Sequence, residues 1–238
     1  MKKKFGLVGG VGYLSTLEYY KGINEGYQKK VKHQSVSSEN PPMVIESLNI
    51  AEAYQLVSNK DWVGFTKLFV NAVNLLHNAG ADFGAIAANT AHIVFDEIQS
   101  QAPIPLISIV EETCKTAMKL GCQRLVIFGT GFTMNSGMFE KKCSQYGIKA
   151  VMPNEIDRQI IHNIIFPNLE AGIVTDQDRQ IINGIANKML KDNKADALVL
   201  GCTELSLVLN KDDFDVYLLD TGEIHIEAIL DYFLCVKP

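Results

Sequence analysis

Short apolar runs alternate along this sequence with longer segments in which apolar residues recur at helical spacing. The runs have no strict polar alternation, which is typical of parallel strands covered on both faces; they are residues 5–8, 43–45, 84–87, 105–109, 124–128, 197–200 and 216–219. The helical spacing predicts helices that follow residue 12 to about 30, span 62–77, begin near 91, follow 131 to 146, span 178–190 and close the chain. This order predicts an α/β fold in which parallel sheets are flanked by helices.

An internal repeat divides the chain into two similar halves. Residues 78–90 align with residues 192–204 at a constant offset of 114, and both copies read helix, Ala-Asp, buried strand, two small residues and a polar pair. In this alignment Ala88 falls on Cys202, and a glycine-rich loop lies upstream in each half, at Gly9 and at Gly129. We therefore expect two pseudo-symmetric lobes, one of residues 1–100 with 210–238 and one of residues 101–209.

The repeat also predicts where a ligand binds. Open α/β sheets bind ligands beyond the carboxyl ends of their strands, so the strand ends of the two lobes are expected to line one cleft between them. Backbone amides and hydroxyls of such a cleft suit a small carboxylate; its expected residues are Gly10, Asn89, Thr90, Thr130, Thr133, Cys202, Thr203 and Glu204. The sequence Gly10-Val11-Gly12 lacks the third glycine and the later acidic residue of a dinucleotide fingerprint, which disfavours NAD binding.

Composition excludes several other classes of function. With 22 Lys+Arg against 27 Asp+Glu, the net charge of -5 gives no basic surface for nucleic acid or an anionic membrane. No apolar stretch is long enough to span a bilayer, and no secretory signal is recognised. The cysteines lack metal-ligand spacing, so no metal site is expected.

The cysteine pattern points to one functional thiol. An odd number of dispersed cysteines argues against a disulfide framework and favours the reducing cytoplasm. Cys202 follows a strand and precedes a helix start, which is expected to lower the pKa of its thiol. The other four are interpreted as packing residues; they are Cys114, Cys122, Cys143 and Cys235.

These motifs resemble the aspartate/glutamate racemase family, in its aspartate racemase and YgeA-like branch. The resemblance covers nearly the whole chain and rests on Gly9-Gly10-Val11-Gly12 with Ser15-Thr16, Ala88-Asn89-Thr90-Ala91-His92, Gly129-Thr130 with Thr133, Gly201-Cys202-Thr203-Glu204, Asp220-Thr221 and His225. It implies an amino-acid racemase that needs neither PLP nor metal, acts on aspartate- or glutamate-like substrates and forms a homodimer. It also implies that two cysteines exchange the Cα proton from opposite faces, with Gly10, Thr16 and the hydroxyls above binding substrate.

One departure from the family pattern concerns the chemistry directly. Ala88 stands where the first cysteine of this family usually stands, and a methyl group can neither accept nor donate a proton. Cys202, assisted by Glu204, is then the remaining acid–base thiol, and by resemblance it serves the L-enantiomer. Proton exchange is expected to be impaired or one-sided. A single-cysteine decarboxylase of the arylmalonate type and a non-catalytic amino-acid-binding homologue are the alternatives.

The residues expected to bind the side-chain end of the substrate depart from the family pattern as well. Aspartate-specific members resemble one another in an Arg and a Lys whose positions align here near Ala53 and Glu170, neither of them basic. Lys60, Lys67 and Arg158 are the other cations available. A dicarboxylic amino acid is the first expectation, and neutral or basic amino acids are the alternatives. His92 is expected either to polarise the site or to stabilise its helix.

Overall fold

The chain folds into two compact units in a computed structural model, which describes residues 3–31 and 39–234. One unit holds the residues up to Ile109 and those from His225 onward, and the other holds Val110–Ile224. These limits differ from the predicted 1–100 with 210–238 and 101–209. The physical reason is strand pairing, because the strand at 106–107 joins the first sheet and the strand at 217–220 joins the second. Cys235, one of the predicted packing residues, lies outside the described residues.

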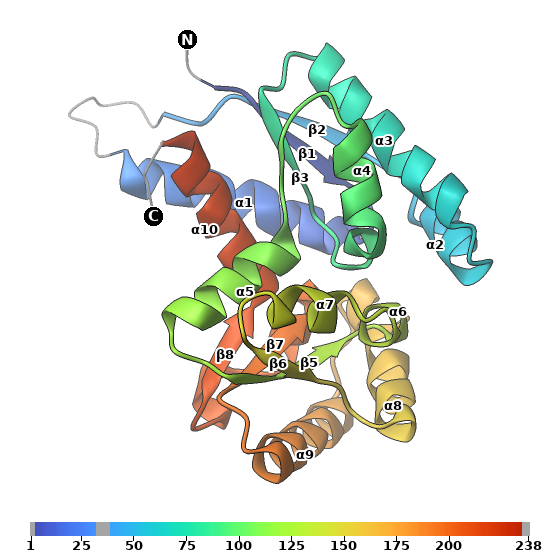
Figure 1. The fold of residues 1–238 in the computed structure, drawn as a ribbon, viewed down its shortest axis with the longest axis vertical. Coiled ribbons are helices and arrows are strands. Elements are labelled where there is room, and N and C mark those ends of the chain that lie inside the picture. Colours follow the sequence, from blue (N-terminus) through green and yellow to red (C-terminus); the bar gives the residue numbers. More distant parts are fainter. Residues whose placement is uncertain (1–2, 32–38, 235–238) are drawn as a thin grey trace. The chain divides into compact units, whose positions relative to one another are not determined.

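The first unit is built on a four-stranded parallel sheet of order β2-β1-β3-β4 (Figure 1). Its strands are β1 (Phe5–Gly9), β2 (Met43–Ser47), β3 (Phe83–Ile86) and β4 (Leu106–Ile107). Its helices are α1 (Tyr13–Lys30), α2 (Ile50–Ser58), α3 (Trp62–Asn78), the 3-10 helix η1 (Thr90–Val94), α4 (Phe95–Gln101) and most of α10 (Thr221–Phe233). Helices α1 and α10 cover one face, where Tyr19 and Ile229 pack on Phe5 and Phe83. Helix α3 covers the other face, with Leu76 against Gly6.

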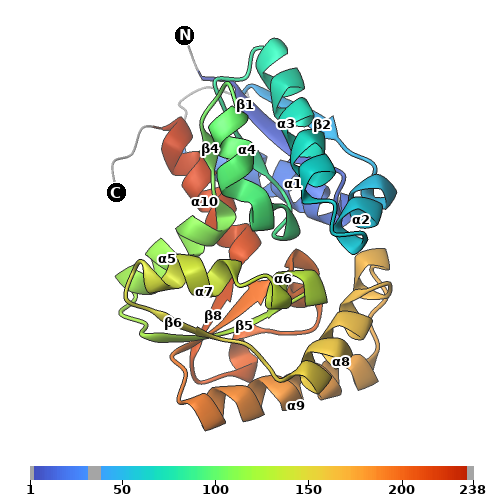
Figure 2. The same cartoon turned by 45° about the vertical axis from the view of Figure 1, so that its right-hand side comes forward.

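The second unit repeats this arrangement with the order β6-β5-β7-β8, again all parallel. Its strands are β5 (Arg124–Gly129), β6 (Lys149–Val151), β7 (Ala197–Gly201) and β8 (Tyr217–Asp220). Its helices are α5 (Ile109–Lys119), α6 (Gly131–Asn135), α7 (Met138–Ser144), α8 (Glu155–Ile165), η2 (Leu169–Ala171), α9 (Asp176–Asn193), η3 (Thr203–Leu207) and η4 (Lys211–Asp213). Figure 2 shows α8 and α9 on one side of this sheet and α5 and α7 on the other.

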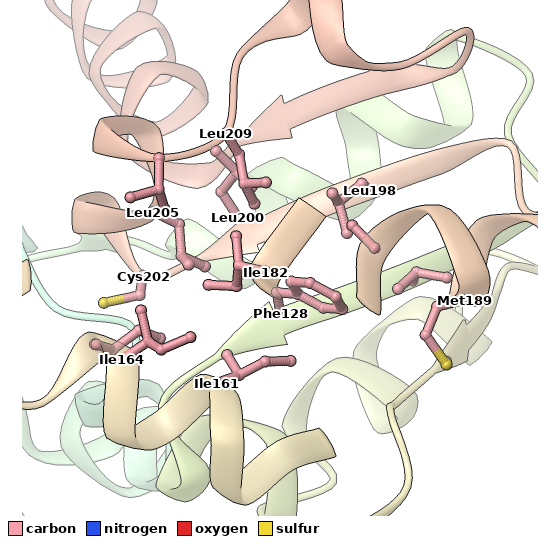
Figure 3. Packing of buried hydrophobic residues seen from close by; sticks show 14 of the residues in the cluster. Phe128, Ile161, Ile164, Ile182, Met189, Leu198, Leu200, Cys202, Leu205 and Leu209 are labelled. Atoms are coloured by element: carbon pink, nitrogen blue, oxygen red, sulfur yellow. The ribbon is translucent and has the colours of Figure 1, made fainter. Parts of the chain in front are cut away.

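The main core of the second unit forms between this sheet and helices α8 and α9. Phe128 of β5 and Leu200 of β7 pack there against Ile161 and Ile182, and all four side chains are buried (Figure 3). Cys202 lies at the edge of the same cluster, next to Ile164 (Figure 3). The apolar core therefore holds the end of β7 that carries the candidate thiol.

The two sheets confirm the predicted fold class of two similar α/β lobes with parallel sheets. Their strand orders correspond one to one, and β3 and β7 occupy equivalent places at the predicted offset. In the first sheet Val8 lies opposite Ile86, and in the second Phe128 lies opposite Leu200. The loops after β1 and β3, and those after β5 and β7, therefore leave the same edge of their own sheet.

Some elements differ from the sequence prediction. The helix expected up to residue 146 is two short helices, α6 and α7, because Gly137 between them has a left-handed backbone (φ 74) that ends the first helix. The helix expected near residue 91 begins as the 3-10 helix η1. Elements α2, α5, β6 and α8 are not predicted. In the part of the chain that the structure describes, no helix is long and apolar enough to cross a membrane.

Candidate functional site

In the second unit, close approach of two strands sets the position of Cys202. Gly129 lies opposite Gly201 where β5 and β7 end. A Cβ on Gly201 would lie 2.6 Å from the Phe128 carbonyl, and one on Gly129 would lie 3.0 Å from the Gly201 carbonyl. Real Cβ atoms do not approach backbone as closely as the first distance and rarely as closely as the second, so glycine is required at position 201 of this crossing and favoured at position 129. The residues that follow the two strands are thereby brought to one edge.

Cys202 donates a hydrogen bond from its thiol to a carboxylate oxygen of Glu204, with 2.9 Å between Sγ and Oε2. The Thr203 hydroxyl donates to the same oxygen at 2.9 Å. Cys202 is 9 % exposed and Glu204 6 % exposed, so this group of three residues is almost withdrawn from solvent. Buried hydrogen bonds to a charged acceptor are strong and directional. The thiol is therefore held in one orientation by an anionic acceptor.

The same surroundings raise the pKa of the Cys202 thiol well above its ordinary value. Burial is the largest cause, followed by the negative charge of Glu204, the thiol's hydrogen bond to it, and the charge of Glu170. The sequence predicts a lowered pKa from a helix start. That prediction is wrong, because the thiol is buried and hydrogen-bonded to Glu204, and because η3 is a 3-10 helix of only five residues. Cys202 rests as a neutral thiol that donates its hydrogen bond to Glu204.

A second carboxylate, Glu170, belongs to this environment and is not predicted as part of the site. It lies in η2, which contacts η3. Burial and the charge of Glu204 raise the pKa of Glu170 to about 7. The only signal in the sequence is its alignment with a basic position of related racemases; its closeness to Glu204 depends on how two distant 3-10 helices pack.

The two remaining predicted residues of the second unit, Thr130 and Thr133, differ in their surroundings. Thr130 caps α6 by accepting from the Thr133 amide at 3.3 Å, and it follows β5 at the same edge as Cys202. Thr133 is fully buried beneath the glycine crossing, and its hydroxyl already accepts a hydrogen bond from Thr130 at 3.3 Å. The structure therefore gives Thr133 a packing contact and does not bring its hydroxyl to the surface of the site.

In the first unit, Gly10 and Thr16 form a closed turn after β1. Gly10 has φ 82, and a Cβ there would collide with the Leu48 carbonyl. The Thr16 hydroxyl accepts from the Gly10 amide at 2.9 Å and donates to the Gly12 carbonyl at 3.2 Å. The predicted pair is thus brought together, and the Thr16 hydroxyl supports the turn.

Ala88, Asn89 and Thr90 follow β3 at the same edge as the Gly10 turn. The Ser15 hydroxyl donates to the Ala87 carbonyl at 3.0 Å, and His92 donates from Nδ1 to the Ala88 carbonyl at 2.9 Å. Asn89 is buried, whereas Ala88 and Thr90 are partly exposed. The backbone at residue 88 is therefore held on both sides by hydrogen bonds from neighbouring helices.

Two buried histidines stabilise this unit in their neutral forms. His92 accepts at Nε2 from the Ile109 amide at 3.2 Å, so its proton lies on Nδ1. His225 donates from Nε2 to the Ile107 carbonyl at 2.9 Å and accepts from the Tyr19 hydroxyl at 2.7 Å. Burial lowers the pKa of His92 to about 4 and, with the nearby His92, that of His225 to about 3. Of the two roles expected for His92, this geometry fits the stabilising one.

No metal-binding group accompanies these residues. Within residues 3–31 and 39–234, no three His, Cys, Asp or Glu side chains are arranged to hold a metal ion. The chemical groups at the strand ends are a thiol, carboxylates, hydroxyls and backbone amides. Such a set can move protons and bind a small polar ligand.

Comparison with known proteins agrees with this geometry. The sequence model of the Asp/Glu/Hydantoin racemase family matches residues 8–229. The broad specificity amino-acid racemase RacX of Bacillus subtilis is 24% identical over 98% of this chain and 99% of its own length. The crystal structure of an aspartate racemase homologue from Pyrococcus horikoshii is 31% identical, with a TM-score of 0.83, over 98% of this chain and 100% of that one.

A more distant structure supports the fold alone. The Picrophilus torridus aspartate racemase superposes with a TM-score of 0.78 at 21% identity, covering 97% of this chain and 94% of that one. The family match spans nearly the whole of the present sequence, so the resemblance seen in its motifs is confirmed. The chain belongs to the Asp/Glu/hydantoin racemase family and is an isomerase of the amino-acid racemase type.

Proposed function

We propose that this protein exchanges the Cα proton of an amino acid through Cys202. The observation that carries the proposal is the 2.9 Å hydrogen bond from the Cys202 thiol to Glu204 at the carboxyl end of β7. A nucleophile or base next to an acceptor within hydrogen-bond reach is the usual arrangement of an activated thiol. Its place at a strand end is where open α/β sheets present catalytic groups.

The proton transfers follow from this pair. Glu204 takes the thiol proton, which leaves a carboxylic acid and a thiolate. The thiolate then takes the Cα proton, which leaves a carbanion, and the steps reverse with a solvent-derived proton. An ordinary thiol with pKa ~8.5 costs ~2 kcal/mol to ionise at pH 7. Burial and the negative charges around Cys202 add to that cost, so the nearby acceptor is essential to the proposal.

The α-carboxylate of the substrate is proposed to bind Asn89, Thr90 and Thr203. Charge that develops on the carboxylate as the proton leaves is stabilised by hydrogen-bond donors fixed in advance. Thr90 begins η1 and Thr203 begins η3, so each lies shortly after the end of a β-strand of its own unit. Thr16 is less suited, since its hydroxyl already bonds to Gly10 and Gly12, and Thr133 is less suited because its side chain is fully buried. The Thr203 hydroxyl donates to Glu204 and would have to turn away from it to donate to the substrate.

Ala88 supports one-sided chemistry. It occupies the position equivalent to Cys202 and carries no group that can move a proton. In this proposal the protein exchanges the Cα proton of one enantiomer, the L-form by family resemblance, and converts it slowly into the other enantiomer.

The charged residues of the protein bear on which substrate side chain it accepts. A dicarboxylic amino acid is the first expectation from the sequence. Of the cations considered for it, Arg158 is occupied, since its guanidinium donates to the Pro153 carbonyl and to Asn135. Glu204 accepts a hydrogen bond from Cys202 instead, and Glu170 adds further negative charge, which weakens the case for an acidic side chain.

We also propose that the protein is cytoplasmic and forms a homodimer. The cysteines 114, 122, 143 and 202 are free thiols, which suits a reducing cytoplasm. Tyr13, Leu17 and Tyr20 form an exposed apolar stripe on α1, which supports a homodimer. Light scattering would give twice the chain mass if the homodimer forms and the chain mass if it does not.

Solvent deuterium exchange at Cα tests the proposed activity. L- and D-amino acids are incubated separately with the protein in heavy water, and Cα deuterium is measured by NMR. Wild type should incorporate deuterium at Cα of one enantiomer faster than it converts that enantiomer into the other. Cys202→Ser should abolish the incorporation. Cys122→Ser, which removes a buried thiol away from the strand end, serves as the matched control. Labelling that survives in Cys202→Ser, or release of carbon dioxide from a malonate without labelling, would contradict the proposal.

A further inference from the structure

We propose that His92 and His225 are positioning residues that together fix the turn of residues 88–90, with which the protein binds an amino acid. The inference rests on the proposed binding of the α-carboxylate by Asn89 and Thr90 and extends it to two buried imidazoles. It is carried by four hydrogen bonds of these two rings, all of which are formed within the first unit.

The segment that follows β3 is held by side chains from two helices. The Ser15 hydroxyl of α1 donates to the Ala87 carbonyl at 3.0 Å, and His92 of η1 donates from Nδ1 to the Ala88 carbonyl at 2.9 Å. The His92 amide also donates to the Asn89 carbonyl at 2.9 Å. His92 therefore bonds to two successive carbonyls of the turn, one through its ring and one through its backbone.

The other nitrogen of the His92 ring is tied to the start of α5. Nε2 accepts from the amide of Ile109, the first residue of that helix, at 3.2 Å. Amides in the first turn of a helix have no acceptor within the helix, so an acceptor from outside is favourable. The ring also stacks on Phe95, with 4.8 Å between centroids and 6° between planes, and His92 is buried. Bonds at both nitrogens and a stacked face fix the ring, and with it the Ala88 carbonyl.

His225 holds the same strand-to-helix junction from α10. Its Nε2 donates at 2.9 Å to the carbonyl of Ile107, the last residue of β4, which lies shortly before Ile109. Its Nδ1 accepts from the Tyr19 hydroxyl at 2.7 Å, and both side chains are fully buried. The two imidazole rings lie edge to face, with 6.3 Å between centroids. His225 thus fixes the junction to which His92 is bonded, and it acts on the turn through that junction.

Both positions need a ring that donates at one nitrogen and accepts at the other, which a neutral imidazole does. A carbonyl oxygen cannot donate, so the proton of His92 lies on Nδ1 and that of His225 on Nε2. Burial is the main cause that lowers the pKa of His92 to about 4 and that of His225 to about 3, so both rings are neutral at pH 7. The two histidines hold backbone groups in opposite tautomers and bring no charge to the turn.

Misplacement of the turn is expected to weaken substrate binding more than it slows proton transfer. Hydrogen-bond donors recognise a carboxylate over a narrow range of distance, and a shift of about 1 Å can cost about 100-fold. Cys202 and Glu204 form their hydrogen bond within the second unit, to which neither histidine belongs. Loss of either imidazole should therefore lower the affinity for an amino acid and leave the thiol pair intact.

Two substitutions at position 92 separate positioning from stability. An asparagine amide reaches about as far as Nδ1 of histidine and a glutamine amide about as far as Nε2. His92→Asn therefore keeps a donor for the Ala88 carbonyl, and His92→Gln keeps an acceptor for the Ile109 amide. Each variant loses one hydrogen bond, so a purely structural role predicts similar effects of both. A positioning role predicts that only His92→Gln disturbs the turn.

Calorimetry with L-glutamate, L-alanine and L-lysine measures the affinity, at a temperature where circular dichroism shows each variant to be folded. His92→Gln and His225→Leu should lower affinity at least about tenfold, and His92→Asn less than about threefold. Ile229→Ala is the control for lost packing, because Ile229 lies one helical turn after His225 and is equally buried. It should leave affinity unchanged. Equal losses in His92→Asn and His92→Gln would overturn the inference.

A second measurement needs no variant to fold. Heteronuclear NMR of the imidazole nitrogens distinguishes the two neutral tautomers of histidine. Wild type should show His92 protonated on Nδ1 and His225 protonated on Nε2. The opposite tautomer of His92 would break its bond to the Ala88 carbonyl and would overturn the inference.

Cα deuterium exchange separates this inference from the proposed activity. Weaker binding in His92→Gln, with no exchange by wild type, would support the inference and overturn the proposed activity. Exchange that Cys202→Ser abolishes, with an affinity unaffected by His92→Gln, would do the reverse. A wild type that binds none of the three amino acids would overturn the inference as well.

Discussion

Asp82 and Asp196 make the same pair of hydrogen bonds in the two units. The Asp82 carboxylate accepts from the Lys4 amide at 2.6 Å, and the Asp82 amide donates to the Lys4 carbonyl at 2.8 Å. Asp196 accepts from the Arg124 amide at 2.8 Å and donates to the Arg124 carbonyl at 2.9 Å. Each aspartate is the residue before β3 or β7, and its two hydrogen bonds join it to the start of the neighbouring strand, β1 or β5. The duplication is therefore one of hydrogen bonding as well as of sequence.

This equivalence makes Ala88 the position where a second thiol is expected to act. Ala88→Cys should raise racemisation by ~10²–10⁴-fold, because one placed acid–base group typically contributes that much. The rate of inversion, followed by chiral chromatography from the L- and the D-form, measures the effect. Ala88→Ser is the matched control, since it adds a similar atom that is a far weaker acid. An Ala88→Cys variant that folds and binds substrate yet inverts no faster would show that residues 88 and 202 do not act on one carbon.

Glu204→Gln should lower the pKa of the Cys202 thiol and slow Cα exchange together. The substitution removes a negative charge and the anionic acceptor beside Sγ, both of which raise that pKa in the wild type. Thiolate absorbance against pH, with the corresponding Cys202→Ser protein subtracted, reports the titration. Exchange should fall at least about tenfold because the acceptor of the thiol proton is lost. An unchanged titration would mean that Glu204 does not govern the thiol.

Thr90→Val should weaken amino-acid binding, while Thr133→Val should not. The Thr90 hydroxyl has no hydrogen-bond partner within the described residues, whereas that of Thr133 is buried and bonded to Thr130. Losing one donor to a buried charge costs about 1–3 kcal/mol, or roughly 5- to 150-fold in affinity. Calorimetric titration of both variants decides the matter. The opposite pattern would return the carboxylate site to Thr133, where the sequence places it.

The sequence could predict the parts of the fold that local patterns determine. Strand ends at Gly9, Gly129 and Gly201 follow from apolar runs that stop at glycine, and the correspondence of the two sheets follows from the repeat. The Cys202–Glu204 pair could be predicted because both residues lie in one short motif. In each case the determining residues are neighbours along the chain.

Features that depend on distant residues could not be predicted in the same way. The pKa of Cys202 is predicted in the wrong direction because burial, the largest cause of its increase, comes from packing, whereas Glu204, the next cause, lies in the same motif. The sequence does not show that Thr133 is fully buried, with its methyl group beside Gly129 and Gly201. The stabilising role of His92 requires the Ile109 amide, which lies beyond β4. Tertiary contacts decide which polar side chains of a motif are free to meet a substrate.

Glu170→Gln should stabilise the protein at neutral and higher pH. A carboxyl group whose pKa is raised by folding favours the folded state below its ordinary pKa, and this contribution is lost as pH rises through the folded value. For Glu170 these limits are 4.5 and about 7. Wild type should therefore lose stability across this interval relative to the variant. The difference should reach about 1–2 kcal/mol above pH 7, since each tenfold change in an ionisation constant is worth about 1.4 kcal/mol and solvent screens part of the effect at this partly exposed carboxylate.

Urea unfolding of both proteins from about pH 5 to pH 8 measures this difference directly. The two free energies of unfolding should lie close together at the acidic end and separate as Glu170 ionises beside Glu204. Glu155→Gln should run parallel to wild type, because an exposed carboxylate has nearly the same surroundings in both states. Parallel curves for wild type and Glu170→Gln at all pH values would show that folding does not bring Glu170 and Glu204 together.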